Sequence, residues 1–294
     1  MSRRSRPFAR APGHLVIIGG GEDRTDGKPI LARFVELSGG PGSRIAVITA
    51  ASRHHAEMMA VYTRAFGDLG VSDLVPVRVD SRAEADDPRI GRLLEGAGGI
   101  FMTGGDQRRL VALVGGTALA CAMHQAFEAG TCIGGTSAGA SALSERMLAA
   151  AEPASAPDQA PPAMSAGLGF LRGAAVDEHF SERRRLGRLL CVVASNPDLL
   201  GMGIDEDTAV VVEPNAGVEV LGTGAVTLID GREALRAAHG RGGPQLSSIR
   251  LHVLPSGFHC HVDAGDDPEP CSLAGIIRSI TRVETGAGVA PPLA

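Results

Sequence analysis

The sequence predicts an α/β protein in which a mostly parallel sheet is flanked by helices, with extra antiparallel strands towards the C-terminus. Over the first half of the chain, short apolar segments alternate with helical patterns. These segments are continuous apolar runs, as in parallel strands that are covered on both faces. Two glycine-rich turns, at 104–105 and 134–139, follow such segments. Because ligands bind beyond the carboxyl ends of parallel strands, both turns should face one crevice.

Composition limits the class of protein. The 294 residues suffice for one large α/β domain or two small ones, and 44% hydrophobic with 21% charged residues is ordinary for a soluble globular protein. The net charge of -5 argues against general nucleic-acid binding. No apolar run approaches the roughly 20 residues that span a bilayer. We therefore expect neither a nucleic-acid nor a membrane partner.

The cysteine pattern favours a reducing compartment. The five cysteines are few, odd in number and without C-x-x-C spacing, which predicts free thiols in a cytoplasmic protein. Cys132 precedes the second glycine-rich turn and is interpreted as a core residue. His259 and His261 alternate along a strand without a third ligand, so no metal site is predicted. No cofactor is predicted either.

The chain between residues 14 and 134 supplies the alternating elements. Strands are expected at 14–18, 44–49, 74–79, 99–103 and 131–134, and helices at 30–37, 54–69, about 88–95 and 108–129, the last one broken at Gly115-Gly116. The first strand ends in Gly19-Gly20-Gly21. A dinucleotide fingerprint would need a glycine where Arg24 stands, so this turn is not one.

The second half is less regular. Residues 150–162 hold four prolines and are expected to form a surface loop. Ser181 is the expected N-cap of a helix that reaches about residue 194. Strands are expected over 218–262, interrupted by a Gly/Arg-rich loop at 231–243, with a last helix at about 273–280.

The turn at 135–139 carries the clearest chemical motif. Gly135-Thr136-Ser137-Ala138-Gly139 is G-x-S-x-G, the nucleophile elbow, with a strand before it and a helical pattern from about Ser141. Such a turn strains the serine backbone and exposes its hydroxyl, and the following helix directs its positive end at a developing oxyanion. The alternative is a glycine-rich strand-to-helix turn without chemistry.

A nucleophilic serine needs a base, and the base needs an orienting carboxylate. Of the nine histidines, His179 stands out because acidic residues precede it and an arginine-rich segment follows it. A structural role for this histidine is the alternative. The carboxylate stays open among Asp205, Glu206 and Asp207.

Four motifs taken together resemble one family. They are Gly104-Gly105-Asp106-Gln107, the segment 134–140, the arginine-rich segment Asp177-x-His179-Phe180-x-x-Arg183-x-Arg185-x-x-Arg188-Leu189, and the segment 203–209. In this order, over about residues 15–212, they resemble the cyanophycinases, which belong to the peptidase E group of serine peptidases. The resemblance implies a fold similar to that of class I glutamine amidotransferases, a flavodoxin-like arrangement. It also implies a homodimer.

The resemblance assigns roles to residues of this chain. It implies that Ser137 is the nucleophile, His179 the base and Glu206 its partner. Backbone N–H groups of Ala138 and Gly105 would form the oxyanion hole. The chain order Ser…His…Glu differs from that of the α/β-hydrolases, which speaks against a lipase or esterase.

The implied substrate is cyanophycin, a poly-aspartate whose side-chain carboxyls carry arginine and from which the family releases β-Asp-Arg dipeptides. Arg183, Arg185 and Arg188 could hold substrate carboxylates, and Asp177 and Glu178 could meet a guanidinium. Gln107 would line the pocket. Arg184 is interpreted as part of a solvated helix face.

One position departs from the family. The family pattern reads Asp-Gln-His-Phe, and Glu178 replaces the glutamine here. A carboxylate beside the base could raise the pKa of His179 or change the favoured substrate group.

Two alternatives to a cyanophycinase stay open: a peptidase E-like aspartyl dipeptidase, and a non-catalytic module that binds an arginyl or aspartyl ligand. We expect a single hydrolytic α/β domain over residues 14–283, between a flexible tail at 1–13 and a loose tail at 284–294.

Overall fold

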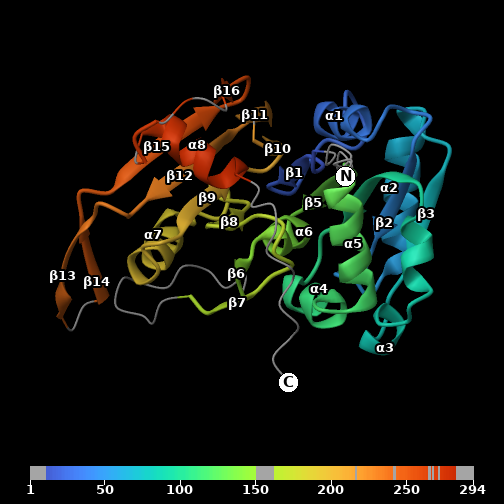
Figure 1. The fold of residues 1–294 in the computed structure, drawn as a ribbon, viewed down its shortest axis with the longest axis horizontal. Helices are drawn as coiled ribbons and strands as arrows, with labels where there is room; N and C mark the ends of the chain where they lie inside the picture. Colours follow the sequence, from blue (N-terminus) through green and yellow to red (C-terminus); the bar gives the residue numbers. More distant parts are fainter. Residues whose placement is uncertain are drawn as a thin grey trace, which may run out of the picture.

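The computed structural model describes residues 11–149, 162–215, 217–240, 243–263, 266, 268–270 and 272–282. Two sheets dominate these residues (Figure 1). The larger has eight strands in the order β16-β11-β10-β1-β5-β4-β2-β3, and the smaller has four in the order β15-β12-β9-β8. The tails expected at 1–13 and 284–294 and the loop expected at 150–162 fall almost entirely outside the described residues.

The larger sheet is parallel over five strands. These are β1 (Leu15–Ile18), β5 (Cys132–Thr136), β4 (Ala97–Met102), β2 (Arg44–Ile48) and β3 (Leu74–Val77). Three antiparallel strands extend it beyond β1: β10 (Thr208–Glu213), β11 (Gly217–Gly222) and β16 (His259–His261). The predicted fold class, including the late antiparallel strands, is confirmed.

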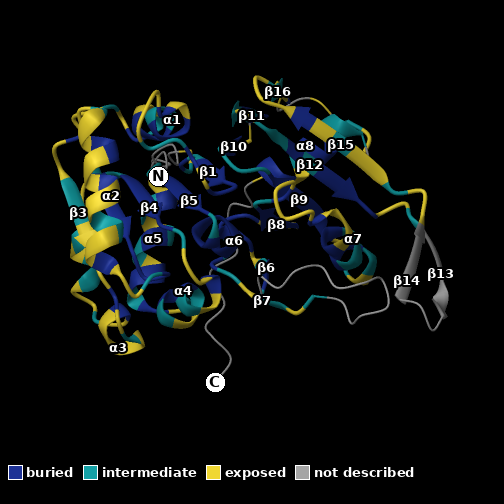
Figure 2. Cartoon of the chain, turned by 180° about the vertical axis from the view of Figure 1, so that it is seen from behind, coloured by how far each residue is buried: buried dark blue, intermediate teal, exposed yellow. Residues whose placement is uncertain are grey.

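Helices cover both faces of this sheet because its strands are apolar on both sides. Along β1, Val16 and Ile18 pack into the cluster that contains α1 (Pro29–Leu37) and α2 (His55–Asp68). Leu15 and Ile17 pack into the opposite cluster, which contains α4 (Gln107–Val114), α5 (Ala118–Glu128) and α6 (Ala138–Leu143). Figure 2 shows the buried strands between partly exposed helices. The helix α3 (Arg82–Ala85) and the 3-10 turn η1 (Ile90–Leu94) complete this half.

The smaller sheet lies beside the larger one and shares its core. A parallel pair, β8 (Ala174–Glu178) and β9 (Leu200–Ile204), is joined by α7 (Leu186–Ser195), and β12 (Ala225–Asp230) and β15 (Arg250–Pro255) follow antiparallel. The remaining elements are α8 (Leu273–Thr281) and two hairpins, β6 (Arg146–Leu148) with β7 (Met164–Ala166) and β13 (Leu235–Gly240) with β14 (Gly243–Ser247). One hydrophobic cluster contains buried side chains from both sheets.

Three local expectations were wrong. The helix expected from Ser181 begins at Leu186, because the chain makes a tight turn first and Arg184 has a φ of 52°. The helix after Ser137 begins at Ala138 and not near Ser141. The Gly/Arg-rich loop expected at 231–243 contains the strand β13, which pairs with β14. In the last case, hairpin pairing between neighbouring segments overrides local glycine content.

Among the described residues, no single helix is long and apolar enough to cross a membrane. The helices α4 and α5 reach that length and composition only when taken together, across a bend of 94°.

Candidate active site

The candidate site lies where strands from both sheets end. Ser137 follows β5, His179 follows β8 and Glu206 follows β9. The turns after β1 and β4 reach the same place, because β1, β4 and β5 are parallel neighbours. The sequence predicted that the glycine turns after β4 and β5 would meet at the carboxyl ends of the strands.

The backbone of Ser137 has the strained geometry of a nucleophile elbow. Its φ of 50° and ψ of -113° lie outside the regions that non-glycine residues usually occupy. Its N–H donates to the Ile18 carbonyl over 3.0 Å, which fixes the turn against β1. A Cβ at Gly135 would lie 2.5 Å from the Gly139 carbonyl oxygen, so strand and helix could not approach as they do.

The side chains of Ser137, His179 and Glu206 form one hydrogen-bonded chain. Ser137 Oγ lies 2.9 Å from His179 Nε2, and His179 Nδ1 lies 2.6 Å from Glu206 Oε1. The histidine side chain is 12% exposed and the glutamate side chain 41%. With Nδ1 donating to the carboxylate, Nε2 is the ring nitrogen free to accept the serine proton. This arrangement can deliver an activated hydroxyl.

The two acids beside Glu206 have other partners. The Asp205 carboxylate accepts N–H groups of Ser181 and Ala225 over 3.1 and 3.0 Å. The Asp207 carboxylate accepts the N–H of Asp23 over 2.9 Å. Among these three acids, Glu206 alone hydrogen-bonds to His179, and its role as the orienting acid stays a prediction.

A glycine turn after β1 supports this chain of side chains. An added Cβ at Gly20 would lie 2.6 Å from His179 Nε2, and one at Gly21 would lie 3.1 Å from Glu206 Oε2. The carbonyl of Gly19 accepts the His179 N–H over 2.8 Å. The sequence analysis excluded this turn as a nucleotide site and gave it no other role. Three consecutive glycines at a strand end were the available signal, because such a run permits another chain to approach closely.

The predicted oxyanion donors adjoin Ser137. Ala138 is the first residue of α6, and Gly104 lies against the nucleophile, since its added Cβ would be 3.4 Å from that of Ser137. Gly105 has a φ of 144° and approaches the Ala51 carbonyl, which an added Cβ would meet at 2.4 Å. Only glycine fits this turn, and the oxyanion role of Ala138 and Gly105 stays a prediction.

Asp177, Arg185 and Arg188 form a buried ionic cluster behind His179. Their exposed fractions are 0%, 1% and 4%. Arg185 Nη1 donates to Asp177 Oδ1 over 3.0 Å, and Arg188 binds both carboxylate oxygens of Asp177. Burial raises the pKa of Asp177, and the two guanidinium groups act in the opposite direction. The expectation that these three side chains contact substrate gains no support from this placement, because their charges are already paired inside the protein.

Glu178, the residue that departs from the family pattern, is also buried. Its Oε2 accepts the Ser141 hydroxyl over 2.5 Å, and its Oε1 lies 3.3 Å from Arg185 Nη1. Burial acts to raise the pKa of Glu178, but the Ser141 hydrogen bond and the charge of Arg185 outweigh it and lower that pKa. The contact joins β8 to α6, the helix that follows the nucleophile.

The other predicted substrate residues differ in exposure. Gln107 is 5% exposed, and its amide lies 3.4 Å from the Leu148 carbonyl. Arg183 is exposed, and its N–H donates to the His179 carbonyl over 3.1 Å. Among the predicted arginines, Arg183 is thus the one that solvent can reach, beside the base.

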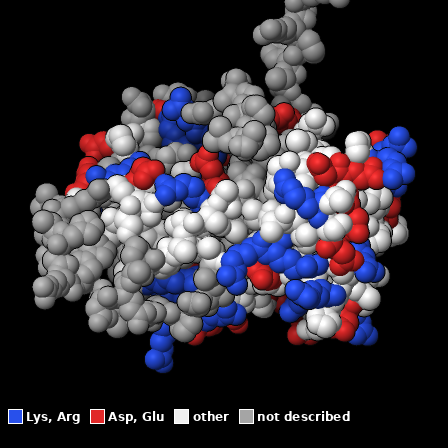
Figure 3. Space-filling model, turned by 90° about the horizontal axis from the view of Figure 1, so that it is seen from below, with Lys and Arg blue, Asp and Glu red and all other residues white. Residues whose placement is uncertain are grey.

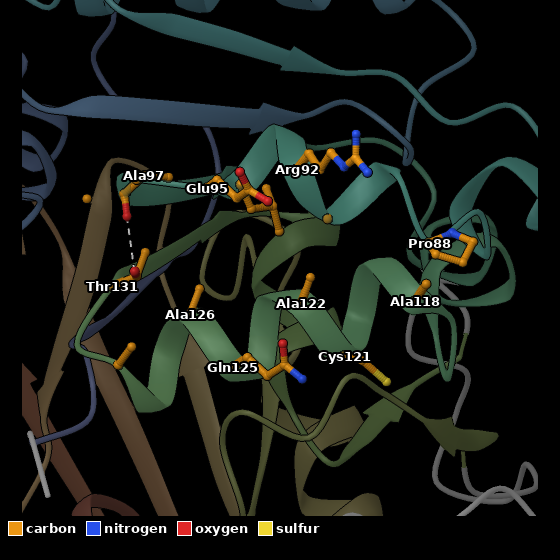
Figure 4. Close-up of a pocket in the computed structure, with 15 residues that line it drawn as sticks. Pro88, Arg92, Glu95, Ala97, Ala118, Cys121, Ala122, Gln125, Ala126 and Thr131 are labelled. Atoms are coloured by element: carbon orange, nitrogen blue, oxygen red, sulfur yellow. Dashed lines mark hydrogen bonds between the residues drawn. The ribbon is translucent and has the colours of Figure 1, made fainter.

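Surface features elsewhere contain none of these residues. A groove of about 820 Å³ runs between η1 and α5, lined by residues such as Arg92, Ala122 and Thr131 (Figure 4). It lies at the amino ends of β4 and β5, opposite Ser137.

On the face shown in Figure 3, basic side chains gather but acidic ones lie among them. Within the described part of the chain, no three His, Cys, Asp or Glu side chains form a group suited to a metal.

Comparison with known proteins gives the family. The model of peptidase family S51 matches residues 15–219. The chain is 38% identical to the cyanophycinase of Geminocystis herdmanii (strain PCC 6308), over 83% of this chain and 91% of that one. It is 38% identical to the cyanophycinase of Synechococcus elongatus, over 87% and 81%.

A solved structure agrees with the fold. The crystal structure of a peptidase from an acI-B1 Actinobacterium superposes with a TM-score of 0.63 at 22% identity, covering 86% of this chain and 98% of that one. At this identity the likeness concerns the fold alone. The family match and the two relatives, each over most of the chain, establish that this protein belongs to peptidase family S51 and is a peptidase, hence a hydrolase.

Proposed function

We propose that this peptidase is a serine exopeptidase that hydrolyses cyanophycin to β-Asp-Arg dipeptides, with Ser137 as nucleophile, His179 as base and Glu206 as its orienting acid. The observation that carries the proposal is the continuous hydrogen-bonded chain from Ser137 Oγ through the imidazole to Glu206. The two relatives named cyanophycinase support the choice of substrate.

The proposed reaction has two halves. His179 Nε2 takes the proton of Ser137 as Oγ attacks the scissile carbonyl carbon. The N–H groups of Ala138 and Gly105 stabilise the oxyanion, and the protonated imidazole then donates its proton to the leaving amine. Water, deprotonated by the same nitrogen, attacks the resulting ester and releases the acid. Throughout, Glu206 holds Nδ1–H and stabilises the imidazolium.

Recognition of a zwitterionic substrate is proposed to fall mainly on Arg183. The guanidinium is exposed, one turn after the base, and can bind a carboxylate through two parallel hydrogen bonds. Gln107 is proposed to line the pocket floor at the start of α4. For Asp177, Glu178, Arg185 and Arg188 we propose a supporting role beneath the site, because their side chains are buried and paired.

Two further proposals concern the setting of the enzyme. Four described cysteines, at 121, 132, 191 and 260, are free thiols, which supports a reducing cytoplasmic compartment. We also propose a homodimer, on the family resemblance alone, which sedimentation analysis of the purified protein would test.

The nucleophile is tested directly by Ser137→Ala. We expect the purified wild-type protein to release β-Asp-Arg from cyanophycin, detected by mass spectrometry. We expect the variant to lose several orders of magnitude in rate without a large change in melting temperature, because Ser137 is partly exposed and does not lie in the core. Ser279→Ala, on the exposed side of α8, is the matched control and should retain activity.

Near-normal turnover by a folded Ser137→Ala would contradict the serine mechanism. Hydrolysis of aspartyl dipeptides to free amino acids, with no dipeptide released from cyanophycin, would favour the peptidase E-like alternative. Tight binding of the polymer with no product from the wild type would favour a binding module.

The orienting acid is tested by Glu206→Gln. Loss of the carboxylate charge removes the partner of the imidazolium, so we expect kcat to fall by about 10³- to 10⁴-fold with KM nearly unchanged. Asp205→Asn and Asp207→Asn are the matched controls. Their carboxylates accept backbone N–H groups, so these changes should lower the melting temperature more than kcat. A larger loss of kcat in either control would show that Glu206 is misassigned.

Substrate recognition is tested by Arg183→Lys. Lysine keeps the charge but cannot form a planar two-bond contact, so on the order of 1–3 kcal/mol of binding should disappear with β-Asp-Arg polymers. A neutral ester substrate should be hydrolysed as by the wild type. Arg184→Lys is the matched control, exposed one residue further on, and should change neither reaction. Equal losses on both substrates would mean that Arg183 supports the fold and not the ligand.

A further inference from the structure

A buried carboxylate lies directly beneath the nucleophile elbow and has no role in the proposed reaction. Glu22 is 3% exposed. Its Oε2 accepts the Thr136 hydroxyl over 2.6 Å, and its Oε1 accepts the Tyr62 hydroxyl over 2.6 Å. The guanidinium of Arg24 has its Nε 3.9 Å from Oε1.

Thr136 and Glu22 belong to the two halves of the site. Thr136 is the last residue of β5 and immediately precedes Ser137. Glu22 itself follows the glycine turn whose Gly20 packs against the His179 ring and whose Gly21 packs against Glu206. The Glu22–Thr136 hydrogen bond therefore ties the strand that delivers the nucleophile to the turn that supports the base and its acid.

Tyr62 connects the Glu22–Thr136 pair to the hydrophobic core. Tyr62 is 1% exposed on α2 and packs against Phe101 of β4, with ring centroids 4.9 Å apart. Burial and the neighbouring Glu22 charge raise the pKa of Tyr62, which keeps its hydroxyl a donor. The carboxylate is thus held from both sides by short hydrogen bonds to charged oxygen.

A buried carboxylate such as that of Glu22 contributes little to the stability of the fold by itself. A carboxylate that is removed from water carries a desolvation cost even with a cation 3.9 Å away, and apolar replacements of buried ionic groups are often neutral or stabilising. What the group does provide is a fixed distance and direction between the chain segments that it joins. In an active site, displacements of about 1 Å already lower rates strongly.

We propose that Glu22 is a positioning residue of the peptidase, which holds the elbow and the glycine turn together so that Ser137 Oγ stays within hydrogen-bonding reach of His179 Nε2. The inference rests on the proposed function. Loss of either hydroxyl contact should therefore reduce the reactivity of Ser137, whatever the substrate.

The test uses the full-length protein and a serine-directed fluorophosphonate. In this reaction Ser137 Oγ attacks phosphorus, fluoride leaves and the serine proton passes to His179, so the labelling rate reports on the Ser–His pair without cyanophycin. Thr136→Val preserves the shape of the side chain and removes its hydroxyl, whereas Thr136→Ser retains the hydroxyl. We expect labelling and kcat to fall about tenfold or more in Thr136→Val, with KM little changed, and to be rescued in Thr136→Ser.

Tyr62→Phe and Glu22→Gln are the second line of variants, and melting temperatures identify any that are unfolded. Should Thr136→Val not fold, the comparison of Tyr62→Phe with the wild type decides. Wild-type labelling rates in folded Thr136→Val or Tyr62→Phe, with only a lowered melting temperature, would show that Glu22 is merely structural. Absence of labelling at Ser137 in the wild type would instead overturn the proposed serine mechanism.

Discussion

The close approach of the His179 ring to the backbone of Gly20 is the constraint on which the site depends. No side chain can stand at Gly20, because even a Cβ would lie 2.4 Å from the ring. This contact brings the end of β8, in the smaller sheet, against the end of β1, in the larger one. Ser137 is fixed to the same point through its N–H bond to Ile18, the last residue of β1. The hydroxyl and imidazole meet because two sheets meet at one glycine turn.

Below this turn the molecule holds an unusual density of buried charge. Arg185 and Arg188 both pair with Asp177, and Glu178 ties β8 to α6 through Ser141. Removing so many charges from water is costly, so this cluster is weak as a source of stability. It does restrict β8, and hence His179, to one position relative to the nucleophile helix. Breaking one partner would leave another charge buried and unpaired, which makes the arrangement intolerant of change.

Much of this was accessible from sequence, and the remainder was not for identifiable reasons. Continuous apolar strands predicted the parallel sheet, and G-x-S-x-G in its strand-to-helix context singled out Ser137 as the candidate nucleophile. Local pattern could not separate Glu206 from Asp205 and Asp207, because the choice depends on which backbone N–H groups reach each carboxylate. Arg185 and Arg188 were expected to bind substrate, since nothing local shows that Asp177 lies in the interior and pairs with both of them. Glu22 was missed because its partners, Tyr62 and Thr136, lie 40 and 114 residues away.

In the proposed mechanism, cleavage of the peptide bond passes through an ester on Ser137. The most direct measurement is to quench the protein in acid during the first turnovers of a β-Asp-Arg oligomer, digest it and map adducts by mass spectrometry. For a serine mechanism we expect a substrate-derived adduct on the peptide that contains Ser137. This adduct should accumulate and then disappear as substrate is exhausted. Turnover with an adduct on another residue, or burst kinetics with no adduct at Ser137, would contradict it.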